Sequence, residues 1–232
     1  AKKDIEKIKF NKISIFLNSL TGMYKSKNTI ENIIQTLMTY KADNTTKSKK
    51  IDLDLMRNWV TNTDEIISNN KEVFSIIGVE ANISIREINS WDQPMIKPNK
   101  QAIFGIISKL FKNNIHFLVK IDGEPGTFDS VELSPTVKVF NNSEIKYNPY
   151  FDFILKSEKK DRLIDSLQSE EGGRFYKEQN RNILVLAKEE FNEDILPGYI
   201  WIDLYQLSFL NQFNNMLNIH LRNFLALIPN HK

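Results

Sequence analysis

The spacing of apolar residues changes along this chain, and the change restricts it to folds that combine helices with a β-sheet. From residue 4 to residue 40, apolar side chains recur every three or four positions, which predicts two helices. Beyond residue 70 the pattern shortens to runs such as Val73–Val79, Ala102–Ile107 and Ile115–Lys120. Short apolar runs of this kind, interrupted by Gly, are typical of strands. The sequence therefore predicts an α+β protein.

Further elements are expected in the second half of the chain. Val131–Phe140 and Asn182–Ala187 are candidate strands, and Arg162–Gln168 is a candidate short helix. From Tyr205 onward, leucines and phenylalanines form an apolar stripe that ends at Pro229. This stripe predicts a long C-terminal helix that packs on the sheet.

The segment Lys41–Lys50 is polar and rich in Lys, Asn and Thr, a composition typical of linkers. We place a boundary there, so that residues 1–50 form an N-terminal helical extension and linker and residues 51–232 form the main domain. With 232 residues, of which 41% are hydrophobic, the chain is long enough to bury an extensive core.

Composition excludes several classes of function. The chain carries 31 Lys and Arg against 29 Asp and Glu, so its net charge of +2 gives no broad field for binding nucleic acid. No stretch is apolar enough to span a bilayer, and the first ten residues lack the apolar core of a signal peptide. We therefore expect a soluble cytoplasmic protein with no nucleic-acid or membrane partner.

Residue supply also limits the chemistry. The absence of cysteine removes disulfides and thiolate catalysis, and fits a reducing compartment. With only three histidines and no EF-hand loop, P-loop or GxGxxG pattern, we expect neither a metal nor a cofactor. A serine triad is also disfavoured, because no GxSxG elbow is present.

The phrase Ser169–Phe175 places two carboxylates before a Gly pair, an Arg and a Phe. The Gly pair permits close approach of the backbone to a ligand, Arg174 is able to grip a diphosphate, and Phe175 is able to pack on a ring. A glycine turn beside a surface ion pair explains the same residues, so both interpretations remain open.

A second group consists of His116, Lys120 and Glu124, on one expected strand and its exit. On a regular strand His116 and Lys120 point to the same face, and Glu124 follows at a turn made by Gly123 and Pro125. These side chains supply three proton-transfer groups. Alternatively, His116 forms hydrogen bonds inside the core and Lys120 is solvated; Glu124 is the stronger candidate because it lies on the turn.

Other polar and aromatic residues form weaker patterns. Trp91–Pro94 presents an aromatic plane and an amide, suited to stacking on a base, although Trp91 is equally suited to the core. Asn214, Asn218 and Arg222 recur every four residues on the expected C-terminal helix, where they form a polar stripe that solvation alone also explains. The remaining candidates, for phosphate contacts, are Lys138, Asn180 and Arg181.

Taken in order, these phrases resemble the NDP-hexose 2,3-dehydratase family, whose members act on dTDP-4-keto-6-deoxyglucose. The resemblance runs from about Val73 to Ile228 and depends on the order of the phrases rather than on any single one. The matching phrases are Trp91-x-Gln93-Pro94, His116–Val119, Glu124-Pro125-Gly126, Leu133–Val137, Ser169–Phe175, Asn180-Arg181, Trp201–Gln206, and Asn218 with Arg222.

The resemblance implies a Nudix-like α/β/α sandwich with a mixed sheet, used without hydrolysis or a catalytic metal, and the sequence has no Nudix box. The implied reaction removes the C3 proton, which the 4-keto group acidifies, and expels the C2 hydroxyl, leaving a 3-ketone. It needs a base at C3, a donor to the C4 oxyanion and an acid at the C2 oxygen. We expect Glu124 or Glu170 as base, Lys120 as oxyanion stabiliser or acid, and Arg174, Arg181 and Lys138 at the diphosphate.

The full set of expected site residues follows from these patterns and the resemblance. The expected catalytic residues are Glu124, Glu170, Lys120 and His116. The expected substrate-binding residues are Trp91, Gln93, Ser134, Thr136, Lys138, Glu171, Gly173, Arg174, Phe175, Asn180, Arg181, Asn218 and Arg222.

The chain departs from the family in length. Family members resemble tandem copies of the domain, whereas this chain holds one copy with a helical lead-in. A symmetric homodimer would restore the missing neighbour, so we expect one, with the N-terminal helices in its interface. The expected partners are a dTDP-linked 4-keto-6-deoxyhexose and a downstream 3-ketoreductase that acts on the unstable product. The alternative is a non-catalytic subunit or regulator that binds nucleotide sugars; a metal-dependent hydrolase is disfavoured by the missing Nudix box.

Overall fold

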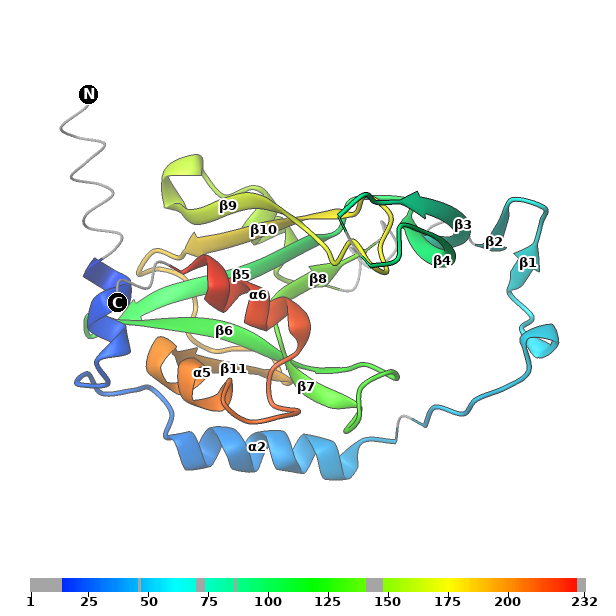
Figure 1. Ribbon diagram of the computed structural model, residues 1–232. Helices are drawn as coiled ribbons and strands as arrows, with labels where there is room; N and C mark the ends of the chain where they lie inside the picture. Colours follow the sequence, from blue (N-terminus) through cyan, green and yellow to red (C-terminus); the bar gives the residue numbers. More distant parts are fainter. Residues whose placement is uncertain (1–13, 46, 70–73, 86, 141–147, 229–232) are drawn as a thin grey trace.

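A computed structural model describes residues 14–45, 47–69, 74–85, 87–140 and 148–228. Its centre is a seven-stranded sheet with the order β11-β6-β5-β10-β9, in which β7 pairs with β6 and β8 with β5. Only β10 and β5 pair in parallel, so the sheet is mixed (Figure 1). The strands are β5 (Ile103–Phe111), β6 (Asn114–Gly123), β7 (Val131–Ser134), β8 (Val137–Val139), β9 (Arg162–Ser169), β10 (Gln179–Leu186) and β11 (Tyr199–Asp203).

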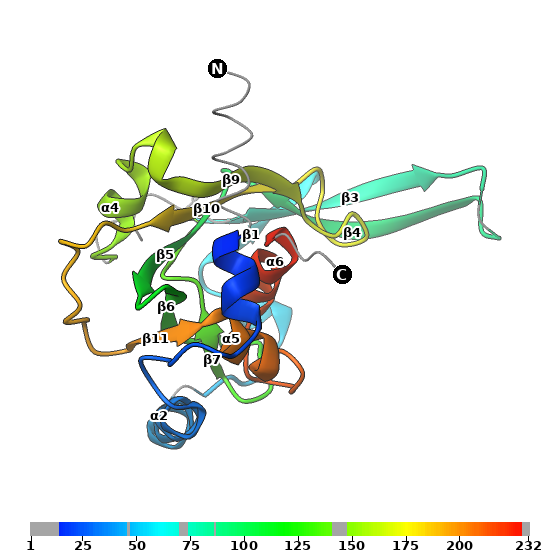
Figure 2. The same ribbon diagram turned by 90° about the vertical axis from the view of Figure 1, so that its left-hand side faces the viewer.

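Helices cover both faces of this sheet. Figure 2 shows α4 (Phe151–Leu155) on one side and α5 (Leu204–Leu210) and α6 (Ile219–Leu227) on the other. Two apolar clusters match this arrangement: one includes Phe224 of α6 and Phe104 of β5, and the other includes Ile154 of α4 and Trp201 of β11. The predicted α+β class with a mixed sheet is confirmed.

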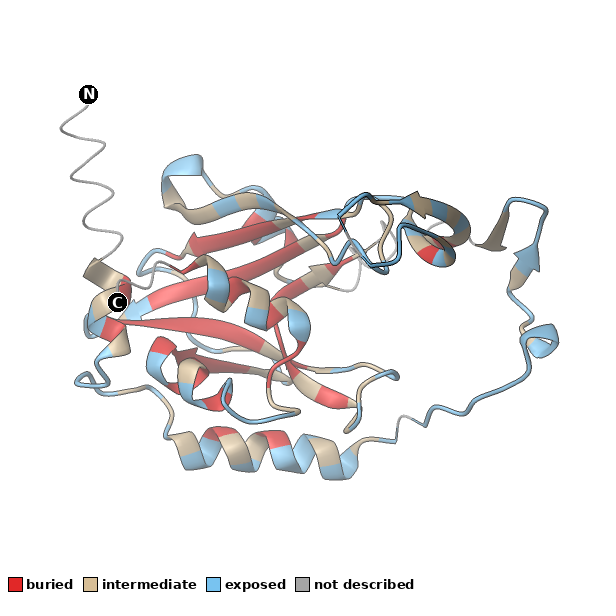
Figure 3. Ribbon diagram, in the orientation of Figure 1, coloured by how far each residue is buried: buried red, intermediate tan, exposed pale blue. Residues whose placement is uncertain are grey.

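A smaller, four-stranded antiparallel sheet extends from the main one. It consists of β1 (Trp59–Thr61), β2 (Glu65–Ser68), β3 (Phe74–Asn82) and β4 (Ser90–Pro98). Figure 3 shows that the residues of this sheet are mostly half-buried or exposed, in contrast to the buried central strands. Backbone hydrogen bonds link it to the loop between β9 and β10: Ile96 N donates to Arg174 O, 2.8 Å, and Tyr176 N donates to Ile96 O, 2.7 Å.

The N-terminal helices pack on the same core as the sheet. Residues 14–20 are helical, and α2 (Ile30–Asp43) is capped by Thr29, whose hydroxyl accepts from Asn32 N. Phe16, Ile33 and Leu37 are buried in the α6-side cluster. The start of the first expected helix, before residue 14, lies outside the described residues. Lys41 belongs to α2, which ends at Asp43, and a short 3₁₀ turn, η1 (Leu53–Leu55), lies before β1. The domain boundary stays a prediction.

Two expectations about secondary structure are wrong. The expected helix Arg162–Gln168 is strand β9, which follows a 3₁₀ turn, η2 (Lys159–Asp161). Its side chains alternate in burial from Ile164 onward and its backbone pairs with β10, so a period of two outweighs the local helical spacing.

The expected long C-terminal helix is two short helices, α5 and α6. Asn215 adopts a positive φ of 60°, and Asn218 caps α6 by accepting a hydrogen bond from Leu221 N, 2.9 Å. Between the helices the backbone pairs with β7 instead, through Leu133 N to Met216 O and Asn218 N to Leu133 O. Asn214, Asn218 and Arg222 therefore do not form one helical stripe.

The main sheet splits near its centre, and this split positions the site. Residues 107–111 of β5 pair with β6, but residues 103–105 pair with β8, while residues 120–123 of β6 pair with β7. Thr136, fully buried between β7 and β8, joins the separating strands: its hydroxyl accepts from Ile107 N, 3.0 Å, and donates to Leu118 O. Within the described part of the chain, no helix is long and apolar enough to cross a bilayer.

Candidate functional site

A group of charged side chains lies where the sheet splits. Lys120 and Asp122 come from the end of β6, Glu124 from the turn that follows, and Lys138 from β8. Together with His220 in the first turn of α6, they line a cavity of about 560 Å³. We call these five residues the Glu124 cluster. Figure 1 shows β7 and β8, which flank this split in the sheet.

Ion pairs connect the cluster. Lys138 Nζ lies 2.8 Å from Asp122 Oδ2 and also contacts Glu124 Oε1, and Lys120 Nζ lies 2.8 Å from Asp122 Oδ1. Asp122 therefore joins the two lysines, and Lys138 joins the two carboxylates. Since every charge has an opposite partner, the cluster is able to stay ionised although it is partly buried.

The neighbouring charges set the protonation states. Burial alone would raise the pKa of Glu124, but the hydrogen bond and charge of Lys138, with Asn218, leave that pKa below its ordinary value. Burial would lower the pKa of Lys138, but Asp122 and Glu124 leave it raised. The carboxylate is therefore held as a proton acceptor and the ammonium as a donor.

Asn218 orients Glu124 from the side of α6. Its Oδ1 caps the helix, and its Nδ2 donates to Glu124 Oε1 and to Ser134 Oγ, both at 3.1 Å. Asn218 is 2% exposed and Ser134 is fully buried. Both were expected substrate-binding residues; the structure places them behind Glu124.

Thr136 and Arg222 lie in different surroundings. Thr136 was also an expected substrate-binding residue, and its hydroxyl is engaged at the split in the sheet. Arg222 is exposed on α6. Burial raises the pKa of Glu132, and the charge of Arg222 opposes part of that rise.

Sequence reasoning missed His220, which was considered only as a possible metal ligand. No spacing connects residue 220 with residue 124; β-strand splitting and the break before α6 bring them to one cavity. The available signal was Asn218. Asn is a residue type that favours helix caps, and Asn218 marks the start of α6 two residues before His220.

The structure does not bring His116 to this cavity. His116 is fully buried near the start of β6, where its Nε2 accepts from Lys27 N, 2.9 Å, and its Nδ1 donates to Asn114 O, 3.0 Å. Both ring nitrogens are therefore used inside the fold, as in the second interpretation of this residue. Burial lowers the pKa of His116.

A second cavity, of about 880 Å³, lies between β4 and the loop that joins β9 to β10. Trp91, Gln93 and Phe175 line it, and the backbone of Gly173 contributes. Trp91 Nε1 donates to Gln93 Oε1, 2.7 Å, and Gln93 Nε2 donates to Gly173 O, 2.5 Å. We call this the β4 cavity. It brings together the Trp91 phrase and the Gly172–Gly173 phrase, which are about 80 residues apart in sequence.

Glu170 belongs to the β4 cavity rather than to the Glu124 cluster. Its Oε1 accepts from Asn180 Nδ2, 2.7 Å, and its backbone N donates to Glu178 O. Asn180 is buried on β10, and its Oδ1 has no hydrogen-bond partner among the described residues. The two carboxylates considered as base therefore lie in different environments.

The arginines expected at a diphosphate are engaged in ion pairs. Arg174 forms hydrogen bonds of 2.8 and 2.5 Å with Glu171 across its own turn, and both side chains are exposed. Arg181 forms two bonds of 2.9 Å with Asp165, and these bonds hold the pKa of Asp165 at about 2. A diphosphate would have to compete with these carboxylates.

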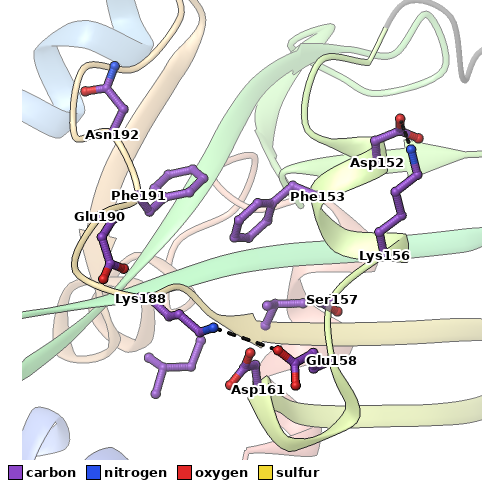
Figure 4. Close-up of a pocket in the computed structure, with 12 residues that line it drawn as sticks. Asp152, Phe153, Lys156, Ser157, Glu158, Asp161, Lys188, Glu190, Phe191 and Asn192 are labelled. Carbon is purple, nitrogen blue, oxygen red and sulfur yellow. Dashed lines mark hydrogen bonds and ion pairs between the residues drawn. The ribbon is translucent and has the colours of Figure 1, made fainter.

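A third cavity, of about 680 Å³, lies beside α4 and contains no expected site residue. Figure 4 shows Phe153 and Phe191 next to each other in its lining, with ring centroids 4.8 Å apart, and the ion pairs of Lys156 with Asp152 and Lys188 with Glu158. These charged side chains are exposed and paired. Among the described residues, no group of three or more His, Asp or Glu side chains is arranged to hold a metal ion.

Comparison with known proteins gives one family. The sequence model of a family described as NDP-hexose 2,3-dehydratase matches residues 30–228. The chain is 35% identical over 190 residues to a dTDP-4-dehydro-6-deoxy-alpha-D-glucopyranose 2,3-dehydratase of Streptomyces violaceoruber, covering 78% of this chain and 42% of that protein. Proteins of the same description from Saccharopolyspora spinosa and Amycolatopsis orientalis are 30% and 28% identical, covering 82% and 78% of this chain and 40% and 39% of theirs.

The chain therefore spans about 40% of the length of these relatives. Among solved structures, the chain is similar to a crystal structure of an ADP compounds hydrolase, with 11% identity and a TM-score of 0.41, covering 80% of this chain and 95% of that one. A similarity this low supports no argument about fold, so the Nudix-like fold stays a prediction.

Proposed function

Because the chain belongs to the NDP-hexose 2,3-dehydratase family, we propose that it dehydrates a nucleotide-linked 4-keto-6-deoxyhexose at C2 and C3. The substrate suggested by its relatives is dTDP-4-dehydro-6-deoxyglucose. The observation that carries the proposal is the Glu124 cluster, in which an ionised carboxylate, an ammonium and an imidazole line one cavity. The alternative, a non-catalytic subunit that binds nucleotide sugars, is an outcome of the test below.

The chemistry requires groups of these types. A base removes the C3 proton, and the C–H electron pair forms an enolate with the C4 carbonyl. As the carbonyl re-forms, a C2–C3 double bond is made and the C2–O bond breaks, while an acid protonates the departing oxygen to give water. The resulting enol becomes a 3-ketone. Each proton transfer is accelerated by a side chain positioned within hydrogen-bond distance.

We assign the base to Glu124 rather than to Glu170. Glu124 is held by Lys138 and Asn218 beside His220 and Lys120, whereas Glu170 receives a hydrogen bond from Asn180 in the β4 cavity. Lys120, whose ammonium is partly exposed at the cavity, is the donor to a substrate oxygen. Lys138 is already shared between two carboxylates, so its role is to hold Glu124 ionised.

The β4 cavity is the proposed place of the nucleotide. Trp91 and Phe175 supply aromatic surface, and Gln93 fixes the loop next to Trp91. Since base stacking on aromatic side chains contributes about 1–3 kcal/mol, these rings are enough to orient a thymine or another base. The side chain of Arg174 becomes a diphosphate contact if it exchanges Glu171 for the ligand.

The predicted partners belong to the same proposal. A homodimer is one of them, and light scattering tests it: a monomer at working concentration overturns it. A 3-ketoreductase would consume the unstable diketone. The cytoplasmic location stays a prediction.

The direct test incubates the purified protein with dTDP-4-keto-6-deoxyglucose, a 3-ketoreductase and NADPH, which trap the diketone. We expect a 2-deoxy product, identified by mass spectrometry and NMR. No product, together with thermal stabilisation by dTDP, would instead support the non-catalytic subunit. Absence of both product and stabilisation would contradict either function.

A further inference from the structure

His220 is a half-buried titratable residue with no catalytic role in the assignments above. It lies in the first turn of α6, where its ring stacks on Phe104 with centroids 3.9 Å apart and planes at 23°, and meets the edge of Phe140 at 5.7 Å. Lys138 is the cross-strand neighbour of Phe104. Two phenyl rings therefore hold the imidazole at the cavity that Glu124 and Lys138 also line.

One nitrogen of this ring lacks the hydrogen bond that a buried polar atom usually makes. Nδ1 of His220 is buried and has no hydrogen-bond partner among the described residues, although most buried side-chain polar atoms have one. His220 nevertheless lines the cavity that holds Glu124 and Lys120. With Nδ1 enclosed, we infer that the ring faces the cavity with the edge that carries Nε2.

The surroundings keep this ring neutral at physiological pH. Burial lowers the pKa of His220 to about 4, the charge of Glu124 opposes this shift, and the charge of Lys138 adds to it. A neutral imidazole carries a single N–H. Because a buried lone pair without a partner is less costly than a buried N–H without one, the proton belongs on Nε2, at the cavity.

We propose that His220 is a catalytic residue of the dehydration, and that its neutral ring donates a hydrogen bond from Nε2 to the C4 oxygen of the sugar as Glu124 removes the C3 proton. The inference rests on the proposed function. Electrons from the C3–H bond move onto the C4 oxygen, where the N–H stabilises the developing charge and the histidine keeps its proton. A histidine with a lowered pKa is suited to this task, since a neutral imidazole is able to polarise a carbonyl.

Placing His220 at the C4 oxygen leaves the C2 oxygen for Lys120. C3 lies between C2 and C4, so a base at C3 needs a donor on either side. With His220 at C4, the ammonium of Lys120 serves as the acid at the C2 oxygen. Its partner Asp122 holds it at the cavity.

Two substitutions at His220 separate the donor from the ring. His220→Phe keeps the stacking on Phe104 but has no ring nitrogen, and His220→Gln keeps an N–H near the position of Nε2. We expect His220→Phe to lower kcat about 100-fold with little change in KM, since loss of one oxyanion donor costs about 10²–10³ in kcat. His220→Gln should recover part of this loss. The control is Ile219→Leu, at the preceding exposed residue of α6, with unchanged kcat.

The measurements are product formation in the coupled assay, the isotope effect of C3-deuterated substrate, and the ring pKa by NMR. We expect an isotope effect at least as large in His220→Phe as in the wild type, and a ring that titrates near pH 4 and is missing from the spectrum of the variant. A His220→Phe protein with more than half of the wild-type kcat overturns the inference. So does a ring pKa near 6.5, or a His220→Gln protein as slow as the Phe variant.

If His220→Phe does not fold, the Gln variant and the ring pKa decide. An inactive wild-type protein is a separate result, because it contradicts the proposed dehydration itself and therefore also this role.

Discussion

The two ends of β6 carry similar polar side chains but use them differently. At its start, His116 has both ring nitrogens in hydrogen bonds, and Asn114 donates to Asp203 and accepts from Ser19. At its end, the Glu124 cluster lines a cavity, and His220 keeps Nδ1 unpartnered among the described residues. The first end is joined to the N-terminal segment through Lys27; the second is open to a ligand.

The difference shows that burial of a histidine does not by itself mark a site. Burial lowers the pKa of both His116 and His220. What differs is that both ring nitrogens of His116 are bonded inside the fold, whereas His220 lines the cavity and, by the inference above, turns Nε2 toward it.

The largest expected effect is on turnover at the open end. Glu124→Gln removes the proposed base and keeps the size of the side chain, so kcat should fall about a thousandfold, within the range for general-base catalysis. The coupled reductase assay measures this. Glu132→Gln, on neighbouring β7, is the matched control and should keep wild-type turnover. In Glu170→Gln we expect a raised KM and an unchanged kcat, because Glu170 lies in the β4 cavity. Two results would contradict the assignment of the base to Glu124: unchanged turnover in Glu124→Gln, or a loss of kcat in Glu170→Gln.

The second effect is a loss of stability in acid. The pKa of His220 is about 4 in the folded protein and about 6.5 when unfolded. Below pH 6.5 the unfolded state therefore binds the proton first, so the free energy of unfolding should fall between pH 6.5 and pH 4 and then level off for this group. The share of His220 is up to about 3 kcal/mol, at 1.4 kcal/mol per pKa unit. His116, with its pKa also lowered, acts in the same direction.

Urea denaturation of the wild type and of His220→Phe across this range measures that share. The variant should lose less stability on acidification, because one of the two imidazoles with a lowered pKa is missing. If the free energy of unfolding falls equally with pH in the two proteins, the His220 ring is not held neutral. Its pKa would then match that of a solvated histidine.

Much of the main sheet was predictable because its signal is local. The apolar runs at β5, β6 and β10 are long enough to specify buried strands, and they formed where expected. β9 was missed because Arg162–Gln168 alternates only partly, and its pairing with β10 decided the conformation. The apolar spacing of the C-terminal segment continues without a break, but Asn215 adopts a positive φ between the two helices and Asn218 caps the second. Apolar periodicity takes no account of such polar residues.

The candidate site was partly predictable for the same reason. Lys120 and Glu124 are close in sequence, so their meeting follows from one strand and one turn. Lys138 and His220 reach the cavity only because β5 and β6 separate and α6 begins at Asn218. Contacts between residues so far apart in the sequence produce no periodic pattern from which they could be predicted. The dehydratase activity, in turn, was predicted from the order of several phrases, not from any one of them.

At the closed end of β6, substitution should change stability without changing chemistry. His116→Leu leaves the backbone N–H of Lys27 and the carbonyl of Asn114 without these partners. An unsatisfied buried polar group costs about 1–3 kcal/mol, so the free energy of unfolding should fall by about 2 kcal/mol. The kcat of the folded fraction, measured after correction by circular dichroism, should match the wild type. A folded His116→Leu protein with a strongly reduced kcat would place His116 in the reaction after all.

The smallest effect separates the two functions of Asn218, which caps α6 with Oδ1 and orients Glu124 with Nδ2. Asn218→Ser keeps a good capping residue but is too short to reach Glu124, so stability should change by less than about 1 kcal/mol. Turnover should fall about tenfold, because Glu124 keeps Lys138 but loses the bond that fixes its angle. Asn218→Ala removes both functions and should lose a further 1 kcal/mol or so of stability at similar kcat. Equal turnover in Asn218→Ser and the wild type would mean that Lys138 alone positions the carboxylate, and that the open end of β6 depends on its ion pairs rather than on α6.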